Sequence, residues 1–188
     1  MPTGQVDVAI GFAAITVHSG QRRKTDETPY IFHPMAVARL VAEGGGTETA
    51  IIAAIMHDAV EDTGLSLEVI ERNFGPQVAA LVDVLTEDKT KTWFERKAHT
   101  IDTVRSWSEP AQLIKLADVV DNLDGNLRYI KKWGPEKLWS QFKQGREFQY
   151  WYNAGIFLNM AAGVGGPLRD HCFESVSGLW LDLVGTDA

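Results

Sequence analysis

The residues best suited to chemistry stand together at the end of an apolar run. His57 and Asp58 follow the apolar residues 50–56 directly, and Glu61 and Asp62 come within the next four positions. At helical spacing His57 and Glu61 are i, i+4 neighbours, as are Asp58 and Asp62. Three carboxylates around one imidazole repel one another unless a cation neutralises them. The pattern is typical of a metal-dependent hydrolase, which needs ligands on one side and a water-activating carboxylate beside them.

Two further segments offer side chains that can bind a metal. His33 lies in the motif Pro-Tyr-Ile-Phe-His-Pro, and Asp118 lies on a predicted helix with Asn122 at i, i+4. Together with His57 and Asp58 they make a set of two imidazoles and two carboxylates. Such a set suits manganese, iron or zinc, and the residue types alone do not choose among them. The competing interpretation is a buried structural His33 and a surface Asp118.

Glu61 and Asp62 are more acids than this ligand set needs. We predict that at least one of them orients or deprotonates the attacking water. The alternative is that both flank the C-terminal end of a helix, where acids oppose the helix dipole at a cost of some tenths of a kcal/mol.

A compact basic cluster, Gln21-Arg22-Arg23-Lys24, precedes His33 in an otherwise acidic chain. Its cations are suited to meet substrate phosphates beside the metal. The alternative is a solvated loop.

Helices must position these side chains, because apolar residues recur at helical spacing along nearly the whole chain. Segment 47–60 is apolar on all sides and is predicted as a central buried helix, capped by Thr47 after the Gly44-Gly45-Gly46 terminator. No alternating strand pattern stands out, so the predicted fold class is all-α. The other predicted helices cover residues 6–18, 33–42, 66–73, 76–85, 91–107, 109–133, 136–162 and 167–184.

The composition limits the class of protein. The chain has 188 residues, a formal net charge of −7 and a sequence pI near 5.2, which argues against general nucleic-acid binding. The length allows a core that needs no disulfide, and the single Cys172 cannot form an internal one. We find neither a signal-peptide pattern nor a run of about 18 apolar residues, so we expect a cytoplasmic protein without a membrane span.

These motifs together resemble the RelA/SpoT-type HD-domain hydrolases, in particular the small stand-alone alarmone hydrolases of the metazoan SpoT-homologue type. The motifs occur in the family's order within residues 8–135, which is far more specific than the His…His-Asp…Asp spacing alone. The matching segments are Gln21-Arg22-Arg23-Lys24, Thr28-Pro29-Tyr30-Ile31-Phe32-His33-Pro34, residues 53–63, Phe74-Gly75-Pro76-Gln77-Val78, Glu87-Asp88-Lys89-Thr90, Glu95-Arg96-Lys97 and Lys115-Leu116-Ala117-Asp118.

The resemblance implies an all-α HD-domain helical fold, a bound Mn²⁺ and a small-molecule nucleotide substrate. The implied metal ligands are His33, His57, Asp58 and Asp118, and the implied water-activating pair is Glu61 and Asp62. The implied substrate contacts are Arg23, Lys24, Lys89 and Asn122. The implied reaction removes the 3′-diphosphate from guanosine 3′,5′-bis(diphosphate) or its 5′-triphosphate form, giving GDP or GTP and pyrophosphate.

Three positions beside Asn122 depart from the family pattern. Val119 and Asp124 stand where the family usually has basic residues, and Asp121 stands where it has tyrosine or histidine. We therefore predict a weakened hold on the far diphosphate, with position 119 facing the substrate. The alternative function is an HD phosphohydrolase for another nucleotide, either an adenosine analogue of the alarmone or the 2′-phosphate of NADPH.

The predicted organisation is a single domain, residues 1–188, in which residues 136–188 supply C-terminal helices that complete the fold. A non-catalytic binding module is the other competing class, but crowded acids are costly to keep without a use. We expect no nucleic-acid or membrane partner, and the aromatic residues within 139–152 leave a homo-oligomer open.

Overall fold

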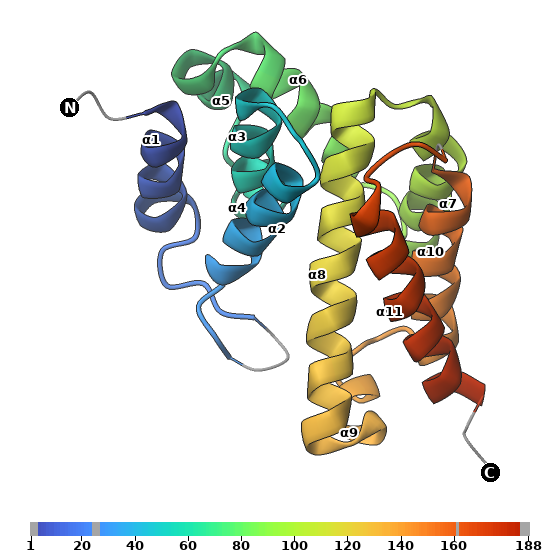
Figure 1. The fold of residues 1–188 in the computed structure, drawn as a ribbon. Coiled ribbons are helices and arrows are strands. Elements are labelled where there is room, and N and C mark those ends of the chain that lie inside the picture. Colours follow the sequence, from blue (N-terminus) through green and yellow to red (C-terminus); the bar gives the residue numbers. More distant parts are fainter. Residues whose placement is uncertain (1–3, 24–26, 161, 185–188) are drawn as a thin grey trace.

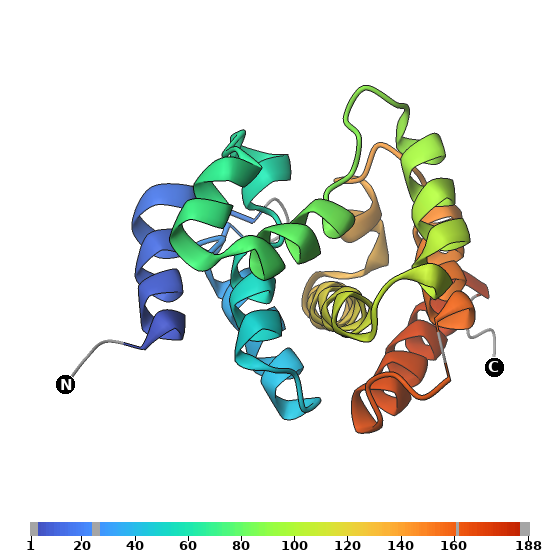
Figure 2. The same cartoon turned by 90° about the horizontal axis from the view of Figure 1, so that it is seen from above.

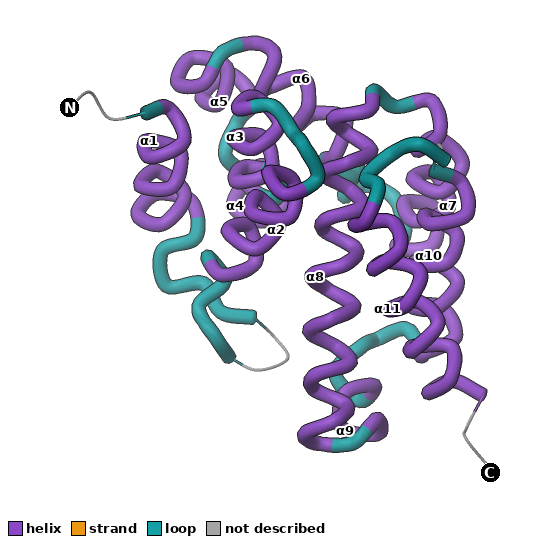
Figure 3. The backbone as a smooth tube through the Cα atoms, in the orientation of Figure 1, coloured by secondary structure: helices purple, strands orange, loops and turns teal. Residues whose placement is uncertain are grey.

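The structure, a computed structural model, describes residues 4–23, 27–160 and 162–184. Within these residues every regular element is a helix, and the β-type pairing is limited to an isolated bridge between Arg22 and Pro29. Figure 1 labels the α-helices. In chain order the helices are α1 (Gln5–Phe12), the π-helix η1 (Ala13–Val17), α2 (Phe32–Glu43), α3 (Glu48–Met56), α4 (Ala59–Thr63), α5 (Leu67–Phe74), α6 (Pro76–Leu85), α7 (Trp93–Thr103), the 3₁₀ turn η2 (Val104–Ser106), α8 (Glu109–Trp133), α9 (Pro135–Trp139), α10 (Arg146–Asn159) and α11 (Pro167–Val184). The predicted all-α fold is confirmed, as the colouring of Figure 3 shows.

The long helix α8 lies in the middle of the molecule, and Figure 2 shows it nearly end-on between two groups of helices. The helices α2, α3 and α6 pack against it from one group, and α10 and α11 pack against it from the other. The outer positions are taken by α1, which packs on α3, and by α7, which packs on α10. The core therefore surrounds α8, and Leu116, Val120 and Leu123 on that helix are fully buried.

Local sequence explains where the central helices begin and end. The hydroxyl of Thr47 accepts a hydrogen bond from the Ala50 amide at 3.3 Å and caps α3, as predicted. The turn before it needs glycine, because a Cβ on Gly46 would lie 2.4 Å from Val41 Cγ1. α8 ends at Gly134, whose φ of 85° is accessible to glycine without strain.

The predicted continuous helix over residues 47–60 is wrong in one respect. α3 ends at Met56, and α4 begins at Ala59 after a turn formed by His57 and Asp58. Asp58 has φ −96° and ψ −2°, outside the regular helical range, and its carbonyl accepts the Asp62 amide that starts α4. Neighbours on one straight helix point about 100° apart, so this break allows both side chains to face the same point.

The predicted helix over residues 136–162 is also interrupted. α9 stops at Trp139 and α10 begins at Arg146 after Gly145, whose backbone is extended. Similarly, α7 begins at Trp93 rather than residue 91, because Thr92 and Glu95 form a reciprocal capping box there. In both cases a local feature, the extended Gly145 or the Thr92–Glu95 capping box, sets the start of a helix that the apolar spacing alone did not mark.

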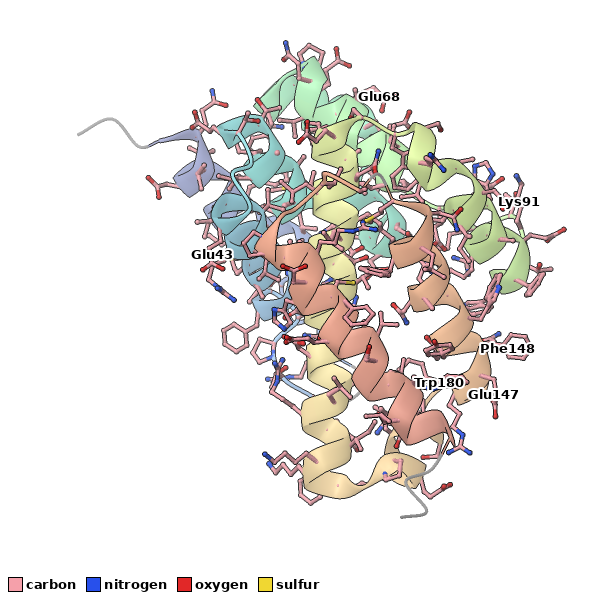
Figure 4. All side chains as sticks on the ribbon, turned by 45° about the vertical axis from the view of Figure 1, so that its right-hand side comes forward. Glu43, Glu68, Lys91, Glu147, Phe148 and Trp180 are labelled. Atoms are coloured by element: carbon pink, nitrogen blue, oxygen red, sulfur yellow. The ribbon has the colours of Figure 1, made fainter. Side chains whose placement is uncertain are left out.

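The surface away from α8 carries charged side chains mixed with aromatic ones. Figure 4 shows Phe148 and Trp180 on the outside of the molecule, with Glu147 beside them, on the helices α10 and α11. Among the described residues, no helix has both the length and the apolar character that crossing a membrane requires.

Candidate active site

Three parts of the fold bring the predicted metal ligands together. His33 lies in the first turn of α2, and Asp118 lies near the middle of α8. His57 and Asp58 form the turn between α3 and α4. Because α2 packs against both α3 and α8, these distant segments meet. The two histidines are buried, and the two carboxylates are partly open to a cavity.

The Nε2 atoms of the two histidines face the same pair of carboxylates. Nε2 of His33 lies 3.5 Å from Asp58 Oδ2 and 3.3 Å from Asp118 Oδ1. Nε2 of His57 lies 3.1 Å from Asp58 Oδ2 and 3.9 Å from Asp118 Oδ1. On the opposite side of the His57 ring, Nδ1 lies 2.8 Å from the Ala54 carbonyl oxygen.

This donor set fits a divalent metal ion. Nε2 of His57 is buried and makes no hydrogen bond to any described residue, although two carboxylates lie beside it. One donor atom from each of His33, His57 and Asp58 lies within 4.8 Å of the other two. Nitrogen and oxygen ligands lie about 2.0–2.2 Å from such an ion, and hence roughly 3–3.5 Å from one another. Small adjustments of these side chains would meet that requirement.

The electrostatics of the cluster favour positive charge at this point. Burial acts to lower the pKa of His33, but hydrogen bonds to neighbouring carboxylates outweigh burial and raise it to about 9. Burial also acts to lower the pKa of His57, and Asp58 reverses the direction. Burial acts to raise the pKa values of Asp58 and Asp118, yet His57 beside the first and Lys115 beside the second keep both below their usual range. Carboxylates that remain ionised here can bind a cation.

Hydrogen bonds from neighbouring residues orient both carboxylates. The Tyr30 hydroxyl donates to Asp58 Oδ2 at 2.5 Å. Lys115 Nζ donates to Asp118 Oδ2 at 2.9 Å, and Asn122 Nδ2 donates to Asp118 Oδ1 at 2.6 Å. Neither Tyr30 nor Lys115 was predicted to have a role in the site. Both stand in the matching motifs, and Lys115 is three residues before a ligand on the same helix face, which is a usable signal.

Glu61 and Asp62 lie on the first turn of α4 beside the ligand cluster. Glu61 Oε1 is 2.7 Å from Lys89 Nζ, and its Oε2 accepts the Glu87 amide at 3.4 Å. Asp62 is exposed and accepts a hydrogen bond from Gln21 Nε2 at 3.2 Å. They do not flank the C-terminus of the central helix, because α3 already ends at Met56 and both acids belong to the separate short helix α4.

The predicted substrate-binding residues differ in burial and in their hydrogen-bond and ion-pair partners. Arg23 Nη1 donates to Asp121 Oδ2 at 2.9 Å, and Arg23 Nη2 donates to Asn122 Oδ1 at 3.0 Å. The Arg23 side chain is mostly buried, at 17% exposed, whereas that of Lys89 is 52% exposed. Lys24 lies outside the described residues. Arg23 and Asn122 are therefore joined beside the cluster, while Lys89 reaches it through Glu61.

Val119, Asp121 and Asp124, the three positions that depart from the family pattern, lie in three different environments. Val119 is 2% exposed within the apolar core, so the prediction that position 119 faces the substrate is wrong. Asp124 lies next to α11, where it accepts from the Ser175 hydroxyl at 2.8 Å and lies 3.0 Å from His171 Nε2. Only Asp121 of the three contacts the ligand cluster, through His33.

A cavity of about 190 Å³ opens onto the cluster. Seven of the residues that line it were predicted from the sequence as site residues. Five others were not: Tyr30, Leu85, Glu87, Lys97 and Lys115. Lys97 Nζ is 2.6 Å from Glu87 Oε1 and 4.6 Å from the centre of the Tyr152 ring. A larger hollow of about 360 Å³ shares Leu85 and Glu87 with it, but none of the predicted ligands lines that space.

The fold and the site define a class of protein. The sequence profile of the family described as HD domain matches residues 9–144, and the chain belongs to this HD-domain family. This outcome confirms the resemblance that the sequence motifs suggested.

Similar proteins narrow the comparison. The protein named guanosine-3′,5′-bis(diphosphate) 3′-pyrophosphohydrolase MESH1 from Xenopus tropicalis is 44% identical over 145 residues, which are 76% of this chain and 78% of that protein. MESH1 from Homo sapiens is 41% identical over the same shares. A solved structure titled as a metazoan ortholog of SpoT that hydrolyzes ppGpp aligns with a TM-score of 0.79 at 31% identity, covering 94% of this chain and 96% of that one.

Proposed function

We propose that this chain hydrolyses guanosine 3′,5′-bis(diphosphate), or its 5′-triphosphate form, to GDP or GTP and pyrophosphate. The observation that carries the proposal is a single cavity that combines a two-histidine, two-carboxylate cluster with the Glu61-Asp62 pair and Lys97. This combination supplies a metal site, candidate bases and a phosphate-binding cation in one place. The relatives named above carry the same activity in their names.

The proposed ligands of a Mn²⁺ ion are His33, His57, Asp58 and Asp118. The bound ion would supply Lewis-acid stabilisation of the charge that develops on the phosphoryl oxygens. Tyr30, Lys115 and Asn122 hold the two carboxylates in place by the hydrogen bonds described above. Fixed carboxylates lose little freedom when they bind an ion, which favours affinity.

The chain's own acids act on the water. Glu61 and Asp62 are proposed to orient it and accept its proton as its oxygen bonds to the phosphorus attached to the ribose 3′ oxygen. The bond between that phosphorus and the 3′ oxygen breaks, the 3′ oxygen takes a proton, and pyrophosphate leaves. Glu61 is anchored at both oxygens, whereas one oxygen of Asp62 is free of partners among the described residues. Asp62 is therefore the better placed of the two to take the proton.

Basic residues near the cavity are proposed to hold the nucleotide. Lys97 lines the cavity, and Lys89, with half of its side chain exposed, forms an ion pair with Glu61 on the cavity wall. Asn122 is proposed to contact the sugar or the reacting phosphate, and Arg23 with Lys24 to lie near the base. An adenosine analogue or NADPH was considered as the substrate because Val119, Asp121 and Asp124 depart from the family pattern. Of these, Val119 is buried in the core and Asp124 contacts α11, so neither lines the cavity. The guanosine alarmone is thus the preferred substrate.

Further features of the proposal concern the whole chain. We infer that residues 1–188 act as one domain, because α11 packs along α8, the helix that carries Asp118. We also place the enzyme in the cytoplasm. Its single cysteine, Cys172, is buried, and burial raises the pKa of that thiol to about 12, so neither a disulfide nor oxidation is expected.

The test is a product analysis of purified protein with added Mn²⁺. We expect GDP and pyrophosphate in equal amounts from the guanosine alarmone, and no product after removal of metal with a chelator. The adenosine analogue and NADPH serve as competing substrates, with orthophosphate measured separately. Faster turnover of either one, or release of orthophosphate from the alarmone, would replace the proposed function by its alternative.

A further inference from the structure

One carboxylate oxygen on α8 joins the ligand cluster to Arg23. Oδ2 of Asp121 lies 2.7 Å from His33 Nδ1 and accepts a hydrogen bond from Arg23 Nη1 at 2.9 Å. The side chain of Asp121 is 10% exposed. Asp121 follows Asp118 by three residues, so both carboxylates lie on the same face of the helix, one directed at each nitrogen of the His33 ring.

The chemistry of imidazole gives this contact its meaning. A histidine that offers the lone pair of Nε2 to a metal carries its proton on Nδ1, and that proton needs an acceptor. His57 has the Ala54 carbonyl oxygen as this acceptor. His33 has a carboxylate instead. An anionic acceptor holds the ring more firmly than a neutral carbonyl does and makes Nε2 a more basic ligand.

Arg23 completes the arrangement from the loop before α2. Its second nitrogen, Nη2, donates to Asn122 Oδ1, and Asn122 Nδ2 in turn donates to Asp118 Oδ1. One guanidinium therefore reaches two predicted metal ligands through two intermediaries: His33 through Asp121, and Asp118 through Asn122. The Asp121 carboxylate thus has two hydrogen-bonding neighbours, the His33 ring and the Arg23 guanidinium, which hold it between them.

We propose that Asp121 is a positioning residue of the metal centre, which fixes the Nδ1–H form of His33, and that Arg23 holds Asp121 in place. Asp121 is one of the three positions that depart from the family pattern described above. This proposal adds a positioning residue to the proposed function, and it rests on the metal site that the proposed function includes. It gives Arg23 a task inside the protein in addition to its proposed place near the base.

The first test measures Mn²⁺ affinity directly, without nucleotide, in Asp121→Ala and Asp121→Asn. Loss of the acceptor should weaken binding by about 10–100-fold in Asp121→Ala, the usual effect of removing such a partner. Asp121→Asn should lose less, because the amide oxygen can still accept from Nδ1. The matched control is Asp124→Asn, which changes the same residue type on the same helix but contacts Ser175 and His171. Its Mn²⁺ affinity should equal that of the unchanged protein.

A spectroscopic measurement separates positioning from loss of fold. The visible absorption of the Co²⁺-loaded protein reports ligand geometry, and it should change in Asp121→Asn while circular dichroism stays the same. Mn²⁺ affinity of Asp121→Ala and Asp121→Asn equal to that of the control, with an unchanged Co²⁺ spectrum, would overturn the proposal. These measurements use no nucleotide and so do not depend on the proposed reaction. If the unchanged protein binds Mn²⁺ but releases no pyrophosphate from the alarmone, that result counts against the proposed function and not against the role of Asp121.

The second test addresses Arg23. Arg23→Ala should weaken Mn²⁺ binding as well, by less than Asp121→Ala, because it leaves the Asp121 carboxylate without its cation. Arg22→Ala is the matched control, since the Arg22 guanidinium donates to the Glu27 carbonyl oxygen instead. A rise in KM for the nucleotide with unchanged Mn²⁺ affinity in Arg23→Ala would show a residue that only contacts substrate, and would remove this part of the proposal.

Discussion

Replacing Val119 by lysine restores the basic residue that the family pattern has at this position, and the structure predicts that the fold responds rather than the substrate. The Val119 side chain is 2% exposed and belongs to the main apolar core. A lysine here has to stay neutral or reach water by disturbing the packing of α8. Either course lowers the free energy of unfolding.

The size of the loss follows from two contributions. Keeping the amine neutral at pH 7 requires a downward pKa shift of roughly 3.4 units, which is about 5 kcal/mol at 1.36 kcal/mol per unit. The added volume costs about 1–3 kcal/mol more, although partial escape of the amine to the surface recovers some of this sum. We expect a net loss of about 4–6 kcal/mol out of the roughly 5–15 kcal/mol of a typical domain. For a chain of this length that corresponds to a fall in Tm of roughly 10–20 °C.

Thermal unfolding at several pH values measures this prediction. The lysine pKa is lower in the folded than in the unfolded state, so the unfolded state binds more protons between those two pKa values and stability rises with pH in that window. The deficit of Val119→Lys should therefore shrink as the pH is raised from 7 towards 10. Val8→Lys is the control, since Val8 on α1 is 49% exposed and its replacement should change stability by less than about 0.5 kcal/mol. A Tm within about 3 °C of the unchanged protein at pH 7, with a lowered KM, would refute the placement of position 119 in the core.

Three further predictions concern the site. Asp118→Ala removes one proposed ligand and leaves Lys115 without its partner, so Mn²⁺ affinity measured by calorimetry should fall by orders of magnitude; full activity of this variant in chelator-treated buffer would remove the metal from the account. Glu61→Gln and Asp62→Asn should keep their metal content but lose turnover by about 10²-fold or more, and a parallel fall of metal content and rate would make these residues ligands instead. Lys97→Ala should raise KM for the alarmone by about tenfold, the equivalent of one charge-assisted contact of roughly 1.5 kcal/mol, whereas an unchanged KM would place the phosphates elsewhere.

The sequence predicted the helices well wherever apolar spacing and end signals agreed. α11 begins and ends where the pattern predicted, and Thr47 caps α3 as its position suggested. The turn at His57 and Asp58 could not be predicted in this way, because the apolar run before it has no glycine or proline to mark an end. Only the packing of α2 and α8 around these two side chains shows why the helix has to break there.

The ligand cluster was predictable from residue types and motif order, whereas its supporting contacts were not. His33, His57, Asp58 and Asp118 meet as the motifs indicated. The contact between Asp121 and His33 joins residues 88 positions apart, and no local pattern reports it. Position 119 was misplaced because comparison with a family pattern indicates which residue type is usual but not which way a helix position faces.

The central claim is that water attacks the phosphorus attached to the ribose 3′ oxygen, and isotope tracing tests it most directly. The protein is loaded with Mn²⁺ and supplied with guanosine 3′,5′-bis(diphosphate) in ¹⁸O-labelled water, and the products of a single turnover are analysed by mass spectrometry. The account predicts one ¹⁸O atom in the pyrophosphate and none in the GDP. Label in the nucleoside product, or labelled orthophosphate in place of pyrophosphate, would contradict it.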